Sequence, residues 1–219
     1  YKDNKIVIRD LKAEDAEVIA AGERAQGWNA SADKYGIRLK DAAEGRAVAM
    51  AAEYEGRVVG YINVYMERLG GAFLEEGVPE IVDFGVLIKY RRHGIGTKLM
   101  DAAEEIARRY SDTVCLGVGL HQGYGSAQRM YVKRGYIPDG SGVWYNDAVC
   151  EPYADCCNSD DLVLYLSKAL QTAEALERSA EQVFMAEITA LTPSQLYISQ
   201  KKLTDVRSWF QCPRDIEKM

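Results

Sequence analysis

The spacing of apolar residues predicts alternating strands and helices over residues 1–168. Runs rich in branched and aromatic residues predict strands at 5–9, 47–54, 57–65, 79–88, 113–120 and 162–167. Apolar positions three and four apart predict helices at 12–25, at 37–43, from Ile95 onward and at 126–134. Glu55 and Gly56 form the predicted hairpin turn, and segments 27–35, 69–77 and the stretch after Tyr136 are interpreted as loops. This order predicts an α/β or mixed α+β fold with several antiparallel neighbours.

Beyond Lys168 the pattern changes to a single long helical run over 170–191, ended by the sequence TPS at 192–194. We therefore expect a compact domain over residues 1–168 and a C-terminal helical extension over 169–219. The extension carries apolar residues that must pack on something, so it would act as a homodimer arm or as a linker to a second module.

Charge and composition narrow the class of partner. The net charge of −6 argues against nucleic acid or an anionic membrane as the main partner, and no apolar run approaches the roughly 20 residues of a membrane helix. No signal peptide is visible, which predicts a cytoplasmic protein. The cysteines fit neither a disulfide framework nor a metal site, so we expect free thiols and no metal. They are Cys115, Cys150, Cys156, Cys157 and Cys212.

The sequence RRHGIG, residues 91–96, lies between a predicted strand and a predicted helix. A glycine-containing turn before a helix suits a phosphate group, because the first helical amides lack internal partners and carry the positive end of the dipole. The other interpretation is a helix start eased by glycine, with solvated arginines. A Walker loop is excluded because Thr97 and Lys98 stand in the wrong order, and a Rossmann fingerprint because position 99 is leucine.

Two motifs resemble those of the GNAT acyltransferase superfamily. Residues 91–96 match its pyrophosphate signature, Arg/Gln-x-x-Gly-x-Gly/Ala, and residues 124–136 resemble its second cofactor motif. In the second motif Ala127, Tyr131, Gly135 and Tyr136 match, whereas Tyr124 stands where the family often has asparagine. The resemblance covers roughly residues 5–168. It implies an α+β fold of three layers, in which helices flank a mixed, mostly antiparallel sheet.

The resemblance also implies an activity. Family members transfer an acetyl group from acetyl-CoA to a primary amine by direct attack in a ternary complex, without a metal. The backbone of Phe84, Gly85 and Val86 would line the pantetheine arm and polarise the thioester carbonyl. The loop that would hold the pyrophosphate consists of Arg91, Arg92, His93, Gly94, Ile95, Gly96 and Thr97. The acceptor would be a small-molecule or peptide amine.

Two catalytic roles follow from the same resemblance. Tyr131 would protonate the leaving thiolate, unless it is only a core aromatic residue. Glu80 would take the proton of the amine, with Asp83 as the alternative base. Asp83 lies three residues further along, so it faces the other side of an ideal strand unless a bulge turns it back. The alternative to a catalytic role is that each carboxylate is simply solvated or forms an ion pair.

The acceptor site is predicted from three segments. Trp28 and Tyr35 belong to the first predicted loop, residues 69–77 to the second, and Trp144 and Tyr145 to the aromatic and acidic stretch after Tyr136. His121 would shuttle a proton or simply form a hydrogen bond. The alternative to an enzyme is a non-catalytic acyl-CoA-binding or sensor module of a larger protein.

Overall fold

The computed structural model describes residues 1–67, 71–73 and 77–170. Part of the predicted loop 69–77 lies outside the described residues. So do almost all of the predicted helix 170–191 and the small helix after it, and with them the proposed dimer arm.

The described residues form one eight-stranded sheet with four α-helices, which confirms the α+β prediction. The strands lie in the order β1-β2-β3-β4-β5-β8-β6-β7. They are β1 (Ile6–Asp10), β2 (Ala47–Tyr54), β3 (Arg57–Tyr65), β4 (Glu80–Val86), β5 (Thr113–Gly119), β6 (Ile137–Tyr145), β7 (Ala148–Val149) and β8 (Leu162–Ala169). The helices are α1 (Ala13–Ala25), α2 (Asp33–Ala43), α3 (Ile95–Ala107) and α4 (Gly125–Lys133), with short 3-10 turns η1 (Ile88–Tyr90) and η2 (Gln122–Tyr124).

Two sequence predictions were wrong in detail. Helix α2 begins at Asp33, before the predicted residue 37, and it starts without a side-chain cap that the sequence would reveal. Strand β6 occupies part of the segment interpreted as a loop. Its pairing with β8 is interrupted between Pro138 and Val143, where Gly140 and Gly142 adopt φ angles of 88° and 91°. Glycine and proline inside a strand hide its periodicity.

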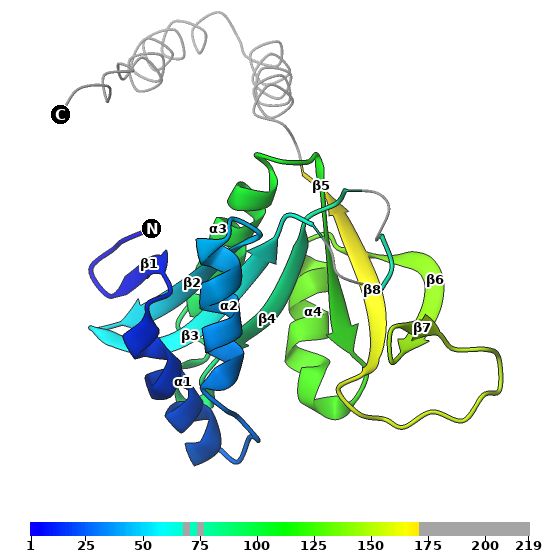
Figure 1. Cartoon of the computed structure of the whole chain (residues 1–219), viewed down its shortest axis with the longest axis horizontal. Helices are drawn as coiled ribbons and strands as arrows, with labels where there is room; N and C mark the ends of the chain where they lie inside the picture. Colours follow the sequence, from blue (N-terminus) through cyan, green and yellow to red (C-terminus); the bar gives the residue numbers. More distant parts are fainter. Residues whose placement is uncertain (68–70, 74–76, 171–219) are drawn as a thin grey trace, which may run out of the picture. The chain divides into compact units, whose positions relative to one another are not determined.

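Helices cover both faces of the sheet. Helices α1 and α2 pack on one face of β2 and β3, and α3 packs on the other face (Figure 1). The face under α3 is lined by a large apolar cluster that includes Ile62, Val64 and Leu99, each of them fully buried. The face under α1 and α2 holds a smaller cluster around Ile19, Tyr35 and Tyr61. We refer below to the α3 face and the α1/α2 face.

The sheet parts in its middle, between β4 and β5. These strands are the parallel pair, and they are joined only through Glu80 with Cys115 and Ile81 with Leu116. All other neighbouring strands are antiparallel, and β5 pairs with β8 along the whole length of β5. Figure 1 shows β4 and β5 diverging, with α4 between them in that view. The split therefore lies beside the second half of β4.

A bulge shapes β4 at the split. Tyr61 pairs with Gly85 and Asn63 pairs with Val82, so the single residue between them on β3 faces two residues of β4, Asp83 and Phe84. Asp83 has a φ of 52°, a left-handed conformation that aspartate tolerates better than most residues. The sequence did not decide whether β4 has a bulge, and the structure shows that it does.

Candidate active site

The edge of β4 that faces the split is open to a ligand. In the described part of the chain, no strand pairs with this edge beyond Ile81. An unpaired strand edge presents backbone amides and carbonyls that bind an extended ligand as an added strand would. Phe84, Gly85 and Val86, the residues predicted to line the pantetheine arm, occupy this part of β4.

The predicted pyrophosphate loop leads from β4 into α3. Gly94 is the residue before the first helical turn and has a φ of 82°, and Arg92 also lies in the left-handed region at 65°. Ile95, Gly96 and Thr97 form the first turn of α3, so their amides lie at the positive end of the helix dipole. This combination of left-handed residues and a helix start suits an anion.

Two contacts fix this loop against β4. The Arg91 side chain donates from Nε to the carbonyl of Val86 at 3.1 Å. A Cβ atom on Gly96 would lie 3.2 Å from Cζ of Phe84, so glycine allows the helix start to approach the strand closely. The ring of His93 packs on Tyr54 with 5.0 Å between centroids, and its Nδ1 donates to the carbonyl of Arg91 at 2.9 Å. The loop and the open edge of β4 are therefore adjacent.

Tyr131 reaches β4 from α4, the helix that follows β5. Its ring lies 6.5 Å from that of Phe84 and 5.8 Å from that of Tyr136, and only 6% of the residue is exposed. Burial raises the pKa of Tyr131 above its ordinary value, and nearby Tyr124 adds to the effect. An ordinary tyrosine is already protonated at neutral pH, as a proton donor must be.

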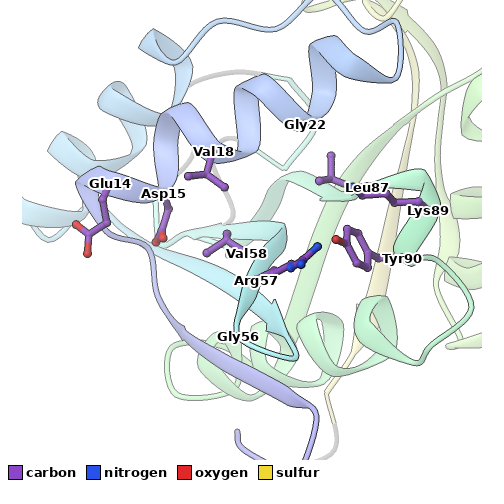
Figure 2. Close-up of a pocket in the computed structure, with 10 residues that line it drawn as sticks. All are labelled: Glu14, Asp15, Val18, Gly22, Gly56, Arg57, Val58, Leu87, Lys89 and Tyr90. Atoms are coloured by element: carbon purple, nitrogen blue, oxygen red, sulfur yellow. The ribbon is translucent and has the colours of Figure 1, made fainter.

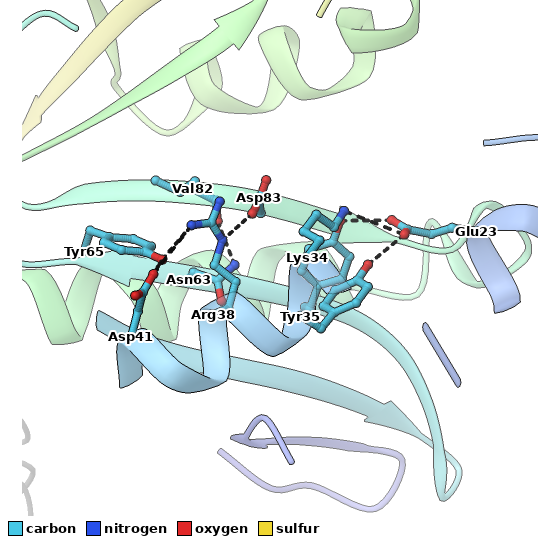
Figure 3. Close-up of polar contacts among 10 residues, drawn as sticks. Glu23, Lys34, Tyr35, Arg38, Asp41, Asn63, Tyr65, Val82 and Asp83 are labelled. Atoms are coloured by element: carbon cyan, nitrogen blue, oxygen red, sulfur yellow. Dashed lines mark hydrogen bonds and ion pairs between the residues drawn. The ribbon is translucent and has the colours of Figure 1, made fainter. Parts of the chain in front are cut away.

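The two candidate bases lie on the same face of β4. Glu80 is half-buried and pairs with Tyr65, so it faces α1 and α2. The bulge turns Asp83 to that face as well, where its Oδ2 accepts from Nε of Arg38 at 2.7 Å (Figure 3). Arg38, on α2, also donates to the hydroxyl of Tyr65 at 2.6 Å. Asp83 thus already has a cationic partner within the chain.

The predicted acceptor residues lie on separate elements. Trp28 follows α1 and lies under the guanidinium of Arg91, 5.6 Å from the ring centre, which places it beside the phosphate loop. Tyr35 is in α2, not in a loop, and it is completely buried, with Lys34 Nζ 4.9 Å from its ring centre. Trp144 and Tyr145 end β6, where Trp144 packs on Tyr165 of β8 at 5.4 Å.

A buried polar network between α1, α2 and β3 was not predicted. Glu23 is 2% exposed and accepts hydrogen bonds from the hydroxyls of Tyr35 at 2.7 Å and Tyr61 at 2.9 Å. Asp41 accepts from Tyr65 and Arg46, and these two bonds lower its pKa. The residues of this network come from α1, α2, the segment between α2 and β2, and β3, so helix and strand periodicity could not pair them. The one local signal is that Tyr61, Asn63 and Tyr65 alternate on β3.

A second polar cluster surrounds His121, which follows β5. Its Nδ1 accepts from the amide of Gly123, so Nε2 carries the proton and donates to Asp160 at 2.9 Å. Tyr124, at the position where the family often has asparagine, donates its hydroxyl to the same carboxylate at 2.8 Å. The bonds from His121 and Tyr124 lower the pKa of Asp160. Asp160 was missed because it lies 39 residues from His121 in the sequence.

A cavity of about 480 Å³ lies elsewhere, between α1, the turn joining β2 and β3, and η1 (Figure 2). Glu14 and Asp15 line it on the α1 side, and Arg57, Lys89 and Tyr90 line the side that leads to the phosphate loop. Its lining contains neither Tyr131 nor the candidate bases, so it is not the split between β4 and β5. The described residues contain no group of three or more metal-ligating side chains, and none of their helices could span a membrane.

Comparison with known families decides the class of protein. The model of the Acetyltransferase (GNAT) family matches residues 11–136, more than half of the chain. The chain belongs to the GNAT acetyltransferase family. It is therefore an acyltransferase, and acetyl-CoA is its cosubstrate. The matched segment contains the open edge of β4, the loop before α3 and Tyr131.

Solved structures share the fold at low sequence identity. Ard1 from Thermoplasma volcanium matches with a TM-score of 0.56 and 19% identity over 77% of this chain and 99% of its own. The ribosomal-protein-S18-alanine N-acetyltransferase from Escherichia coli has a TM-score of 0.55 and 14% identity over 77% and 96%. The yncA protein from Salmonella typhimurium, solved with its cofactor acetyl-CoA, has a TM-score of 0.54 and 15% identity over 77% and 95%. No curated protein matches the chain.

Proposed function

We propose that the chain transfers the acetyl group of acetyl-CoA to a primary amine of a small molecule or peptide, by direct attack in a ternary complex. The observation that carries this proposal is the parting of β4 from β5 directly beside the loop that opens α3. An extended ligand on the edge of β4 would end at the first turn of α3, where an anion is favoured. A pantetheine arm followed by a pyrophosphate has this order of groups.

The residues present suit such a ligand. Gly85 and Gly96 let the backbone lie close to an aromatic ring, since a Cβ atom on Gly85 would lie 3.0 Å from Tyr61 and one on Gly96 would lie 3.2 Å from Phe84. Arg91 and Arg92 bring positive charge to the loop. We propose that amides 92–97 hold the pyrophosphate and that amides at the bulge of β4 stabilise the developing oxyanion of the thioester.

We assign the proton transfers to two side chains. Glu80 takes the proton of the attacking ammonium group, directly or through one water, so that a neutral nitrogen attacks the carbonyl carbon. The carbon–sulfur bond then breaks and Tyr131 donates its proton to the departing thiolate. Glu80 is assigned as the base because the family often has a glutamate near this position, and Asp83, which accepts from Arg38 at 2.7 Å, is the alternative.

The test is thiol release from acetyl-CoA against a panel of amines: a polyamine, an aminoglycoside, a free amino acid and a lysine-containing peptide. Release with one amine class supports the proposal and identifies the acceptor. Binding of acetyl-CoA without release on any amine would instead favour a sensor module. The homodimer contact proposed for residues 169–219 is tested separately, by the mass of the full chain in solution.

A further inference from the structure

The ammonium group of Lys34 lies among two tyrosines and a carboxylate. Lys34 Nζ donates to the hydroxyl of Tyr61 at 2.9 Å and lies 4.9 Å from the ring centres of both Tyr35 and Tyr61. The carboxylate of Glu23 is 3.7 Å away (Figure 3). Two aromatic faces and one carboxylate form the kind of cage that binds alkylammonium groups.

The cage itself is buried. Tyr35 is 0% exposed, Glu23 is 2% exposed and Tyr61 is 6% exposed. Both tyrosine hydroxyls donate to the two oxygens of Glu23, which holds the carboxylate in place. The Lys34 side chain, in contrast, is 35% exposed and enters the cage from the surface of α2. The amine is thus the partly exposed member of a buried site.

This cage adjoins the residue proposed to flank the thioester. Tyr61 pairs with Gly85, and a Cβ atom on Gly85 would lie 3.3 Å from the Tyr61 hydroxyl oxygen. Since that hydroxyl is 2.9 Å from Lys34 Nζ, the Lys34 nitrogen is at most about 8 Å from the Cα atom of Gly85. Rotation about the four side-chain torsions of lysine spans such a gap.

We propose that Lys34 is a site of self-acetylation, a proposal that rests on the proposed function. Glu23 takes one proton from the Lys34 ammonium, and the neutral nitrogen attacks the thioester carbonyl carbon of acetyl-CoA. The new carbon–nitrogen bond replaces the carbon–sulfur bond, and the thiolate leaves with a proton from Tyr131. The products are an uncharged acetyl-lysine and free coenzyme A, and no further reactant is needed.

The test follows acetylation by site. The full chain is incubated with acetyl-CoA carrying a deuterated acetyl group, and the occupancy of each lysine is measured by mass spectrometry over time. Lys40 is the matched control, since it lies on the same helix and its side chain is 72% exposed. Chemical acetylation would favour the more exposed Lys40. Self-acetylation predicts that Lys34 is labelled at least about tenfold faster, as expected for an oriented neighbour.

Two further measurements sharpen the result. An intramolecular transfer predicts that the rate at Lys34 per molecule is unchanged when the protein is diluted, and that Y131F and E23Q each slow labelling of Lys34 but not of Lys40. The proposal is overturned if Lys40 is labelled as fast as Lys34, or if the rate at Lys34 falls with dilution. Y131F keeps the test valid if E23Q does not fold.

Failure of the inference is distinguishable from failure of the proposed function. Thiol release with an added amine, without any label on Lys34, overturns self-acetylation alone. No shift of the unfolding midpoint with acetyl-CoA, and no release with any amine, overturns both.

Discussion

The two faces of the sheet are built differently. Under α3, Ile62, Val64 and Leu99 belong to a large apolar cluster. Of the five buried polar or charged residues among those described, four lie on the α1/α2 face, and the fifth, Glu104, lies on α3, where it accepts from Arg134 and Lys168. The four are Asp15, Glu23, Asp41 and Asn63.

We infer from this difference that the α3 face mainly stabilises the fold and that the α1/α2 face holds β4 in the geometry that the proposed chemistry needs. Buried polar groups cost free energy unless each is hydrogen-bonded, so a fold retains them where geometry matters more than stability. On the α1/α2 face the bonds from Arg38 to Asp83 and to Tyr65 connect α2 directly to the bulge of β4. The apolar cluster under α3 packs against the opposite face of the sheet.

The largest expected effect is that of removing the Tyr131 hydroxyl. It tests the division between the two faces, because Tyr131 is on the side of α3 and α4 yet is assigned a chemical role. Y131F removes one hydroxyl and keeps the ring that packs on Phe84. We expect kcat to fall by about 10³-fold, the usual contribution of a positioned proton donor, with little change in the unfolding midpoint. Steady-state kinetics and thermal unfolding of the same sample check this. A kcat within a factor of about three of wild type would remove Tyr131 from the mechanism.

A core truncation on the α3 face comes next. L99A removes a side chain with 0% exposure, and we expect the free energy of unfolding to fall by about 3 kcal/mol. The loss should be the same at pH 4 and pH 7, because no titratable group is removed. Denaturant unfolding at both pH values measures it. A loss that depends strongly on pH would contradict the view that Leu99 contributes through apolar packing alone.

The third comparison separates the candidate bases on the polar face. E80Q is expected to lower kcat/KM by about 10²-fold, whereas D83N keeps a hydrogen-bond acceptor for Arg38 and is expected to cost about tenfold or less. The ratio of the two, measured as kcat/KM over pH, decides the assignment. A larger loss in D83N would make Asp83 the base.

The smallest expected effect concerns Asp41. Hydrogen bonds from Tyr65 and Arg46 lower its pKa in the folded state, so its contribution to stability is present above the unfolded pKa of about 3.9 and is lost as the pH falls through the folded pKa. D41N should therefore cost about 1–2 kcal/mol at pH 7 and progressively less in acid. Urea unfolding between pH 7 and pH 3 tests this. A cost that does not shrink in acid would contradict the assignment.

The sequence predicted the elements that carry a strong local signal. The hairpin of β2 and β3 turns at Glu55 and Gly56 as expected, and α3 begins at Ile95 as expected. Strand β6 was hidden because Gly140 and Gly142 break its alternation. The position of Tyr35 was misjudged because α2 starts without a capping side chain.

The candidate site was predictable only where it is local. The loop 91–97 and Tyr131 lie within short motifs, so one sequence was enough to find them. Arg38 and Asp83 are 45 residues apart and are joined by packing of α2 on the sheet, which no local pattern encodes. The orientation of Asp83 depends on a bulge of a single residue, and the sequence left its presence open.

The most direct test of the central claim, that acetyl-CoA binds on β4 and at the start of α3, is the thermal unfolding midpoint with and without acetyl-CoA. The wild type is compared with G94V and with G45V. Gly94 and Gly45 have similar φ angles of 82° and 76° with open space around each, so the backbone strain is matched, but only Gly94 is in the loop. We predict that acetyl-CoA raises the midpoint of the wild type and of G45V, because a ligand of the folded state stabilises it, and raises that of G94V far less. An equal rise in all three proteins, or no rise in the wild type, would contradict the account.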